Sequence, residues 1–184
     1  VFTHPVFLKG KLMEIGADRQ LFLDDYWIEN SNEVTRVLHS PVRRESAIVM
    51  DRPWEDGVLG YLVTFWDKDK YRAWYRAGRE NKTGYAESTD GIHWEKPELG
   101  IIDFGGSKNN NLVWDGPGGN MSPFKDSNPN VSEDEQYKAF VRTGDILALV
   151  SPDGFNWSLK QQEPILDERP FDSHNIVFWD TWRK

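Results

Sequence analysis

The chain has 184 residues, of which 38% are hydrophobic and 28% charged, and its formal net charge is −8 at pH 7. This balance is typical of a folded globular protein, and the excess of acids argues against nucleic acid or an anionic membrane surface as a partner. The lack of cysteine excludes disulfides, thiolate metal sites and a cysteine nucleophile, and no apolar run approaches the ~18 residues of a membrane span.

Along the chain, residues 1–20 carry little pattern, 21–28 predict a strand with an acidic centre, and 34–50 predict extended chain. From residue 58 onward, short β-rich runs alternate with polar turns, and no helical stripe of apolar residues is present. The first unit is predicted to contain strands at 58–66, 71–76, 84–88 and 99–104. The second unit repeats this order at 120–126, 137–141, 146–151 and from 164, and a third unit begins at 176–180.

The pattern Ser-x-Asp-Gly-x-x-Trp occurs twice, at 88–94 and 151–157, with a constant spacing of 63 residues from Ser88 to Ser151. Asp-Gly is a turn dipeptide, because Asp bonds nearby backbone amides and Gly adopts positive φ without a steric penalty. The Trp that follows is expected to anchor the turn in a core. We interpret the pattern as a fold marker rather than an active site, and its spacing indicates a repeated unit.

The prediction is an all-β protein built from four-stranded antiparallel blades of a β-propeller. We expect about two and a half blades of one propeller domain, since a repeat unit cannot bury its faces alone. The predicted division is an N-terminal extension with a closing strand (1–50), blade one (51–104), blade two (105–168) and the start of blade three (169–184).

The repeat, the turns and the aromatic-rich strands resemble the five-bladed β-propeller glycosidases, which include the β-fructosidases, arabinanases and β-xylosidases. The likeness covers residues 45–184 and is strongest to a bacterial branch similar to the N-terminal domain of fructosidase-type enzymes. The stretches that carry it are Pro53-Trp54-Glu55, Phe124-Lys125-Asp126 and residues 171–180. The resemblance implies five blades in the complete protein and cleavage of glycosidic bonds in poly- or oligosaccharides by carboxylates around the propeller axis. The W-M-N-D-P motif of the fructosidase nucleophile is absent.

In that family the carboxylates lie at the opening ends of the innermost strands, which here correspond to 54–56, 120–122 and 172–175. Asp172 is the first catalytic candidate, followed by Glu55 and Asp56, because glycoside hydrolysis needs a proton donor and a nucleophile or base. The candidates for substrate binding are His174, Asn175, Trp54 and Asn120. Each has a structural alternative: a strand cap for Asp172, a solvated loop acid for Glu55, a structural imidazole for His174 and core packing for Trp54.

Three aspartates, Asp67, Asp126 and Asp180, each come two residues after a Phe and just before a predicted hairpin turn. An Asp that recurs in this register most simply starts the turn. We therefore interpret Asp126 as a structural residue and not as a stabiliser of a transition state.

The predicted function is glycoside hydrolysis, with a carbohydrate as the partner and with activity expected to need the complete propeller. Two alternatives stay open: a sugar phosphorylase of similar shape, with Arg43 and Arg44 in a basic phosphate pocket, and a non-catalytic carbohydrate-binding propeller. No residue pattern indicates a metal or cofactor, although such propellers can hold a structural calcium ion. The sequence begins at Val1, so a secreted or periplasmic location is left open, as is the oligomeric state.

Overall fold

The structure is a computed structural model that describes residues 16–17, 21, 23–57, 59–167, 171–181 and 183. The chain divides into two compact units, Val1–Arg44 and Glu45–Lys184. The described part of the first unit has turns and bends but no strand, so the strand predicted at 21–28 is wrong. Here the backbone amide of Tyr26 donates to Asp24 Oδ1 at 2.9 Å, a local bond that favours a turn.

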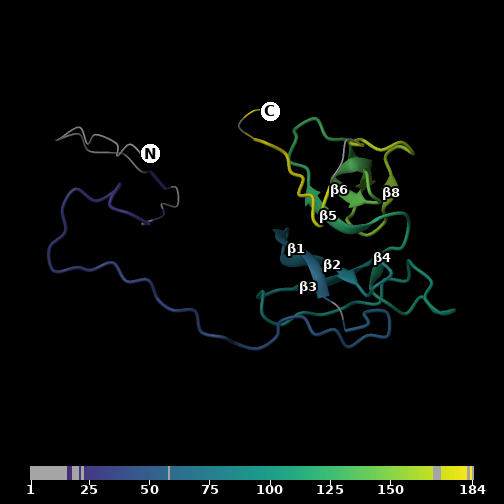
Figure 1. Cartoon of the computed structure of the whole chain (residues 1–184), viewed down its shortest axis with the longest axis horizontal. Helices are drawn as coiled ribbons and strands as arrows, with labels where there is room; N and C mark the ends of the chain where they lie inside the picture. The colour runs from purple at the N-terminus through teal and green to yellow at the C-terminus, as the bar shows by residue number, and fades with distance from the viewer. Residues whose placement is uncertain are drawn as a thin grey trace. The chain divides into compact units, whose positions relative to one another are not determined.

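The second unit holds two four-stranded antiparallel sheets whose strands follow one another in sequence order (Figure 1). The first sheet consists of β1 (Leu59–Asp67), β2 (Lys70–Ala77), β3 (Lys82–Ser88) and β4 (Leu112–Trp114). The second consists of β5 (Gly119–Lys125), β6 (Tyr137–Arg142), β7 (Ile146–Ser151) and β8 (Ser158–Leu159). Among the described residues the one helix is a short 3₁₀ turn, η1 (Glu133–Glu135). The prediction of an all-β chain with four-stranded antiparallel units is confirmed.

The outer edges of both sheets differ from the prediction. The fourth strand of the first sheet is β4, not 99–104, and it therefore lies beyond residue 104, where the first unit was expected to end. In the second sheet β8 comes before residue 164, and Leu166 adds only an isolated bridge to Ile146. The strand predicted at 176–180 is not formed.

These outer edges share one construction, in which two separate pieces of chain pair with the third strand. Next to the repeated turn, Glu95 pairs with Glu87 in the first sheet, and Ser158 pairs with Val150 in the second. Farther along the same strands, Trp114 pairs with Thr83 and Leu166 pairs with Ile146. The intervening loop is long in the first sheet (96–111) and short in the second (160–165), so the repeat is better kept in the first three strands of each sheet than at the fourth.

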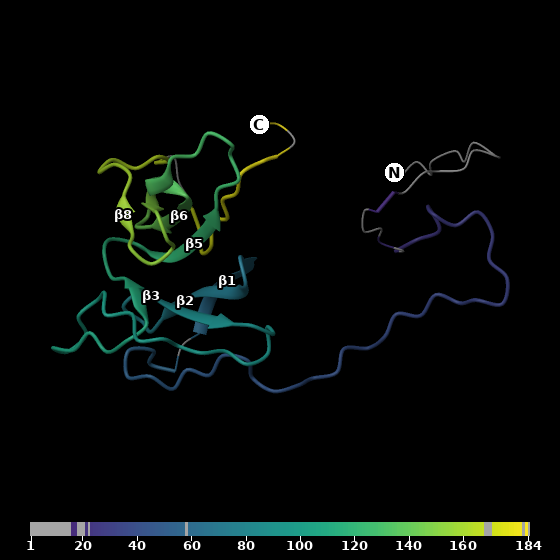
Figure 2. The ribbon, with the colours of Figure 1, turned by 180° about the vertical axis from the view of Figure 1, so that it is seen from behind.

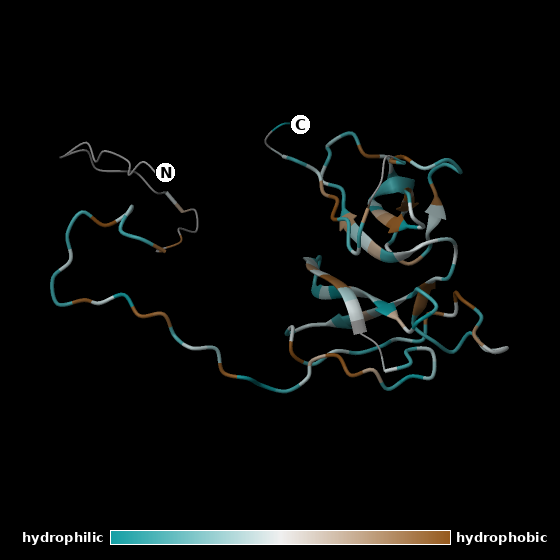
Figure 3. Ribbon diagram, in the orientation of Figure 1, coloured by the Kyte–Doolittle hydropathy of each residue, from teal (hydrophilic) through white to brown (hydrophobic). Residues whose placement is uncertain are grey.

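The main core lies between the two sheets. Alternate residues of a strand point to opposite faces, so Trp74 of β2 faces this core while its neighbours Ala73 and Tyr75 face away. The buried members are Trp74, Tyr85, Val113 and Trp114 from the first sheet, and Met121, Ala139, Val141, Leu147 and Leu149 from the second. The hydrophobic colour of the short β4 strand in Figure 3 agrees with the burial of all its residues.

The other face of the first sheet has a smaller core, which segments outside the sheet cover. Its buried residues are Ala73, Tyr75, Ala77, Ala86 and Leu112, and the side chains packed on them are Ile48, Met50, Trp54, Trp94, Ile102 and Phe104. The chain before β1 is therefore part of the fold of this sheet from about Ile48 onward.

Both copies of the repeated pattern form the same hydrogen-bonded turn. Ser88 Oγ accepts from the amides of Asp90 and Gly91 at 3.2 and 2.9 Å, and Ser151 Oγ accepts from Asp153 and Gly154 at 3.3 and 2.9 Å. In each copy the Asp Oδ1 accepts two further amides at 2.8 Å, and the Trp Nε1 donates to the Gly carbonyl oxygen. Both glycines have positive φ (76° and 84°), and both Trp rings are partly buried. The pattern is a fold marker, as predicted.

Candidate functional site

The first strands of the two sheets, β1 and β5, are interrupted at the same place. Pairing with the neighbouring strand shifts between Gly60 and Val63 in β1 and between Gly119 and Ser122 in β5. The residues after the two glycines, Tyr61 and Asn120, have left-handed backbones with φ of 50° and 55°. A non-glycine residue rarely adopts this conformation, and β-bulges that contain one are concentrated beside binding and catalytic sites, where they re-aim side chains.

A third segment, 171–175, lies against these two strand openings. Asn120 Nδ2 donates to the carbonyl oxygen of Ser173 at 2.8 Å, and the ring of His174 lies 3.3 Å from the carbonyl oxygen of Met121. The rings of Tyr61 and His174 meet edge to face, with centroids 5.5 Å apart. Figures 1 and 2 show the segment running beside β5 in both views. Two of the three predicted openings, 120–122 and 172–175, are thus in contact, while the place predicted for 54–56 is taken by Tyr61 of β1.

The predicted residues Asp172, His174, Asn175 and Asn120 all belong to this group, which we call the opening cluster together with Tyr61 and Ser173. Asp172 is exposed and accepts a hydrogen bond from Ser173 Oγ at 2.9 Å. Asn175 Nδ2 donates to the carbonyl oxygen of Asp172 at 3.0 Å and thereby closes a local turn. The cluster presents an accessible carboxylate next to amide, imidazole and phenol groups, a combination suited to binding hydroxyl-rich ligands.

Glu55 is not part of the opening cluster, and the prediction that it faces a cavity together with Asp172 is wrong. Its side chain is 0% exposed and accepts hydrogen bonds from the Tyr75 hydroxyl at 2.6 Å, Lys96 Nζ at 2.8–2.9 Å and the Arg52 amide at 2.9 Å. Burial, together with the adjacent Glu55 carboxylate, raises the pKa of Tyr75. A buried carboxylate with three donors is a structural anchor beneath the small core, since no substrate can reach it.

Trp54 and Asp56 flank Glu55 in the sequence, but the side chain of Trp54 lies against the small core and that of Asp56 is exposed. Trp54 packs on the small core, donates from Nε1 to Asn111 Oδ1 at 2.8 Å and meets the Phe104 ring edge to face at 5.9 Å. Asp56 is exposed, has a left-handed φ of 48°, and lines a shallow hollow next to Gly78. Trp54 therefore matches its core-packing alternative, while a catalytic role for Asp56 stays a prediction.

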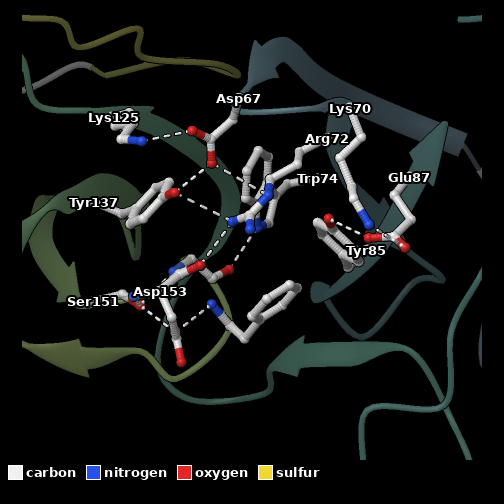
Figure 4. Close-up of polar contacts among 12 residues, drawn as sticks. Asp67, Lys70, Arg72, Trp74, Tyr85, Glu87, Lys125, Tyr137, Ser151 and Asp153 are labelled. Atoms are coloured by element: carbon white, nitrogen blue, oxygen red, sulfur yellow. Dashed lines mark hydrogen bonds and ion pairs between the residues drawn. The ribbon is translucent and has the colours of Figure 1, made fainter. Parts of the chain in front are cut away.

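A second polar cluster, which the sequence did not indicate as a site, joins the two sheets at their opposite, turn-side ends (Figure 4). Asp67 is 3% exposed and accepts from Lys125 Nζ at 2.6 Å and from the Tyr137 hydroxyl, while Arg72 Nε lies 3.3 Å from its Oδ2. Burial alone would raise the pKa of Asp67, but the bonds from Lys125 and Tyr137 and the charge of Arg72 lower it overall.

This cluster, which we call the sheet junction, also holds the second repeated turn. Arg72 Nη1 donates to the carbonyl oxygen of Asp153 at 2.8 Å, and Trp74 Nε1 donates to that of Gly154 at 2.9 Å. The Arg72 guanidinium also lies over the Phe155 ring, 5.0 Å from its centroid. Because Asp67 is buried and its two carboxylate oxygens already bond Lys125, Tyr137 and Arg72, we interpret the sheet junction as a structural ion-pair network.

Asp126, the equivalent of Asp67 in the second sheet, follows β5 directly. Its Oδ1 accepts from the Asn128 amide at 2.9 Å and its Oδ2 pairs with Lys138 Nζ at 2.6 Å. This geometry agrees with the predicted role of Asp126 in the turn.

Within the residues the structure describes, no group of three or more His, Asp or Glu side chains is arranged to hold a metal ion. No described helix is long and apolar enough to cross a membrane. Comparison of the chain with protein-family models, with curated protein sequences and with solved structures gives no match.

Proposed function

We propose that this chain is part of a β-propeller glycoside hydrolase and that the opening cluster contributes to its substrate site. The two sheets are consecutive meanders with the same strand order, they pack through a shared core, and both inner strands carry a bulge at the same position. These features are those expected of neighbouring propeller blades, whose inner strands surround a common axis.

The observation that carries the proposal is the contact of segment 171–175 with the openings of β1 and β5, through Asn120–Ser173 and Tyr61–His174. Sugars are recognised by hydrogen-bonding side chains that converge with an aromatic face, and the opening cluster supplies both. Asp172 is the exposed carboxylate of the cluster, and in this proposal it transfers a proton to or from the glycosidic oxygen or water. A second carboxylate of the kind that hydrolysis requires must face it across the substrate.

The test is turnover of a panel of neutral oligosaccharides by full-length protein that carries Asp172→Asn. This substitution keeps the size of the side chain but removes its proton-transfer chemistry, so kcat should fall by about 10²-fold or more with little change in unfolding free energy. Asp126→Asn is the matched control, because it should disturb the turn after β5 and the ion pair with Lys138 but leave kcat of the folded protein unchanged.

Unchanged turnover of Asp172→Asn would refute the role of Asp172. Binding of oligosaccharides without any turnover would favour the non-catalytic alternative. Each assay is run with and without inorganic phosphate, since turnover that depends on phosphate would favour the phosphorylase alternative.

A further inference from the structure

Two arginines occupy equivalent positions beside the two bulges. Arg76 at the end of β2 is the pairing partner of Gly60, and Arg142 at the end of β6 is the pairing partner of Gly119. The glycine of each pair directly precedes a residue with a left-handed backbone, Tyr61 in the first sheet and Asn120 in the second. The repeat thus places one guanidinium at each strand opening.

Both guanidinium groups are fixed by neutral main-chain carbonyls. Arg76 donates from Nε to the carbonyl oxygen of Gly78 at 3.1 Å and from Nη2 to that of Arg79 at 3.2 Å. Its guanidinium carbon, Cζ, lies 5.9 Å from the centroid of the Tyr61 ring. Arg142 donates from Nε to the carbonyl oxygen of Phe171 at 2.7 Å, directly before Asp172. Each arginine therefore contacts the opening cluster or the residue that leads into it.

The charge of these two arginines is not balanced in the way that the charge of the third partly buried arginine is. Three described arginines are partly buried, namely Arg72, Arg76 and Arg142. Arg72 is paired with Asp67, whereas no carboxylate of the described residues forms an ion pair with Arg76 or Arg142. Several exposed arginines do have such partners: Arg36 with Asp25, Arg52 with Asp51 and Arg183 with Asp180. This imbalance occurs in a chain whose net charge is −8.

We propose that Arg76 and Arg142 make the opening cluster a binding site for an oxyanion. This proposal rests on the proposed function, which places the sugar at the opening cluster. A partly desolvated guanidinium gains most from an anionic partner, and its planar fork matches the oxygens of a carboxylate, sulfate or phosphate. Within the part of the chain that the structure describes, Arg76 Nη1 and both terminal nitrogens of Arg142 have no hydrogen-bond acceptor, so they are the donors for this ligand. The ligand is therefore either an acidic sugar or an inorganic oxyanion that binds beside a neutral sugar.

The experiment measures binding to the full-length protein by calorimetry and by the NMR signals of the His174 ring, which lies in the opening cluster. The ligands are inorganic phosphate, sulfate, a neutral oligosaccharide and the same oligosaccharide with a terminal uronic acid. We expect the oxyanions or the acidic sugar to bind, to shift the His174 signals and to be displaced by salt. Binding of free phosphate identifies an inorganic ligand, and preference for the uronic acid over the neutral sugar identifies an acidic glycan.

Arg76→Gln and Arg142→Gln should each weaken this binding by about tenfold or more, the scale of a lost charge-assisted hydrogen bond. Arg183→Gln is the matched control, because Arg183 is 91% exposed and paired with Asp180, and it should leave binding unchanged. Arg142→Lys retains the charge without the fork and should bind with intermediate affinity. Thermal melts of every variant show whether it is folded.

Failure of this inference is separable from failure of the proposed function. If neutral oligosaccharides are cleaved with an Asp172 dependence but oxyanions neither bind nor shift the His174 signals, the oxyanion site is refuted and the hydrolase proposal stands. If oxyanions bind and the arginine variants weaken that binding while no glycoside is cleaved, the site stands and the hydrolase proposal falls. Binding that is equal in Arg76→Gln, Arg142→Gln and Arg183→Gln overturns the assignment of the arginines.

Discussion

The two repeated turns have the same internal hydrogen bonds but different surroundings. In the first, Ile92 is 49% exposed and the nearest neighbour of the glycine is the ring of Tyr71. In the second, the carbonyl oxygens of Asp153 and Gly154 accept hydrogen bonds from Arg72 and Trp74 of the other sheet. The difference teaches that the short sequence pattern specifies the turn itself, while the neighbouring sheet determines whether the turn also serves as an interface.

The turns differ in one side chain that contacts the Asp. In the first turn His93 Nδ1 lies 2.7 Å from Asp90 Oδ2, and in the second Asn156 Nδ2 donates to Asp153 Oδ2 at the same distance. The imidazole can carry a charge that the amide cannot. Accordingly His93 lowers the pKa of Asp90, and Asp90 in turn raises the pKa of His93.

The largest expected effect comes from removing Asp67, which holds the Arg72 side chain that bonds the second turn but not the first. Asp67→Ala should lower the unfolding free energy by about 3–5 kcal/mol in urea titrations at pH 7, because it leaves Arg72 and Lys125 without their anion. The pKa of Asp67 is lowered, so its stabilisation holds above about pH 4 and is lost as the pH falls through the folded value. Asp69→Ala in the exposed turn after β1 is the control, with a change within about 0.5 kcal/mol. Equal losses for the two variants would contradict the proposed support.

A matched pair of glycine substitutions should separate the two turns by a smaller amount. A Cβ at Gly154 would lie 3.0 Å from the Trp74 ring and 3.2 Å from Arg72 Nη1, whereas a Cβ at Gly91 would meet only the Tyr71 ring, at 3.4 Å. We expect Gly91→Ala to cost about 1–2 kcal/mol for the left-handed backbone alone. Gly154→Ala should cost about 1–3 kcal/mol more because of overpacking at the interface. Chemical denaturation measures both, and a larger loss for Gly91→Ala would reverse our assignment of the buried turn.

The smallest expected effect concerns pH. The pKa of His93 is raised, so its contribution to stability is fully present below its unfolded pKa of about 6.5 and is lost as the pH rises through the folded value. His93→Asn copies the second turn and should remove this dependence. The measurement is the difference in melting temperature between the two proteins across about pH 5.5 to 8.5, with an NMR titration of His93. A variant whose melting temperature follows the same pH curve as the unmodified protein would show that the pair contributes nothing.

The sequence predicted those features whose causes are local. Ser88, Asp90 and Gly91 bond within their own turn, so both turns and the strands that lead into them were placed correctly. Convergence of Asn120 with 172–175 was also predicted, because the repeat register aligned the strand openings.

The errors arise where a partner is far away in sequence. Glu55 was predicted to be a catalytic acid or a solvated loop acid, because its partners Tyr75 and Lys96 follow it by some tens of residues. The sheet junction was missed for the same reason, since Asp67 meets Lys125 and Tyr137 from the second sheet. An outer strand was predicted at 99–104, but Asn110 holds that loop, because its Nδ2 donates to the carbonyl oxygen of Ile102 and its carbonyl oxygen accepts from the Leu99 amide. Arg76 and Arg142 became notable only once the structure showed that no carboxylate of the described residues pairs with them.

The two-piece outer edge has a consequence for how such a chain tolerates change. The pairings of Glu95 and Trp114 with β3 are independent of the length of chain between them, and the second sheet makes the corresponding pairings of Ser158 and Leu166 with a much shorter connection. Insertions and deletions can therefore accumulate at the rim during evolution without shifting the inner strands. The same property makes the segment around Gly105 and Gly106, both exposed with positive φ, a natural place to graft an epitope or a reporter peptide.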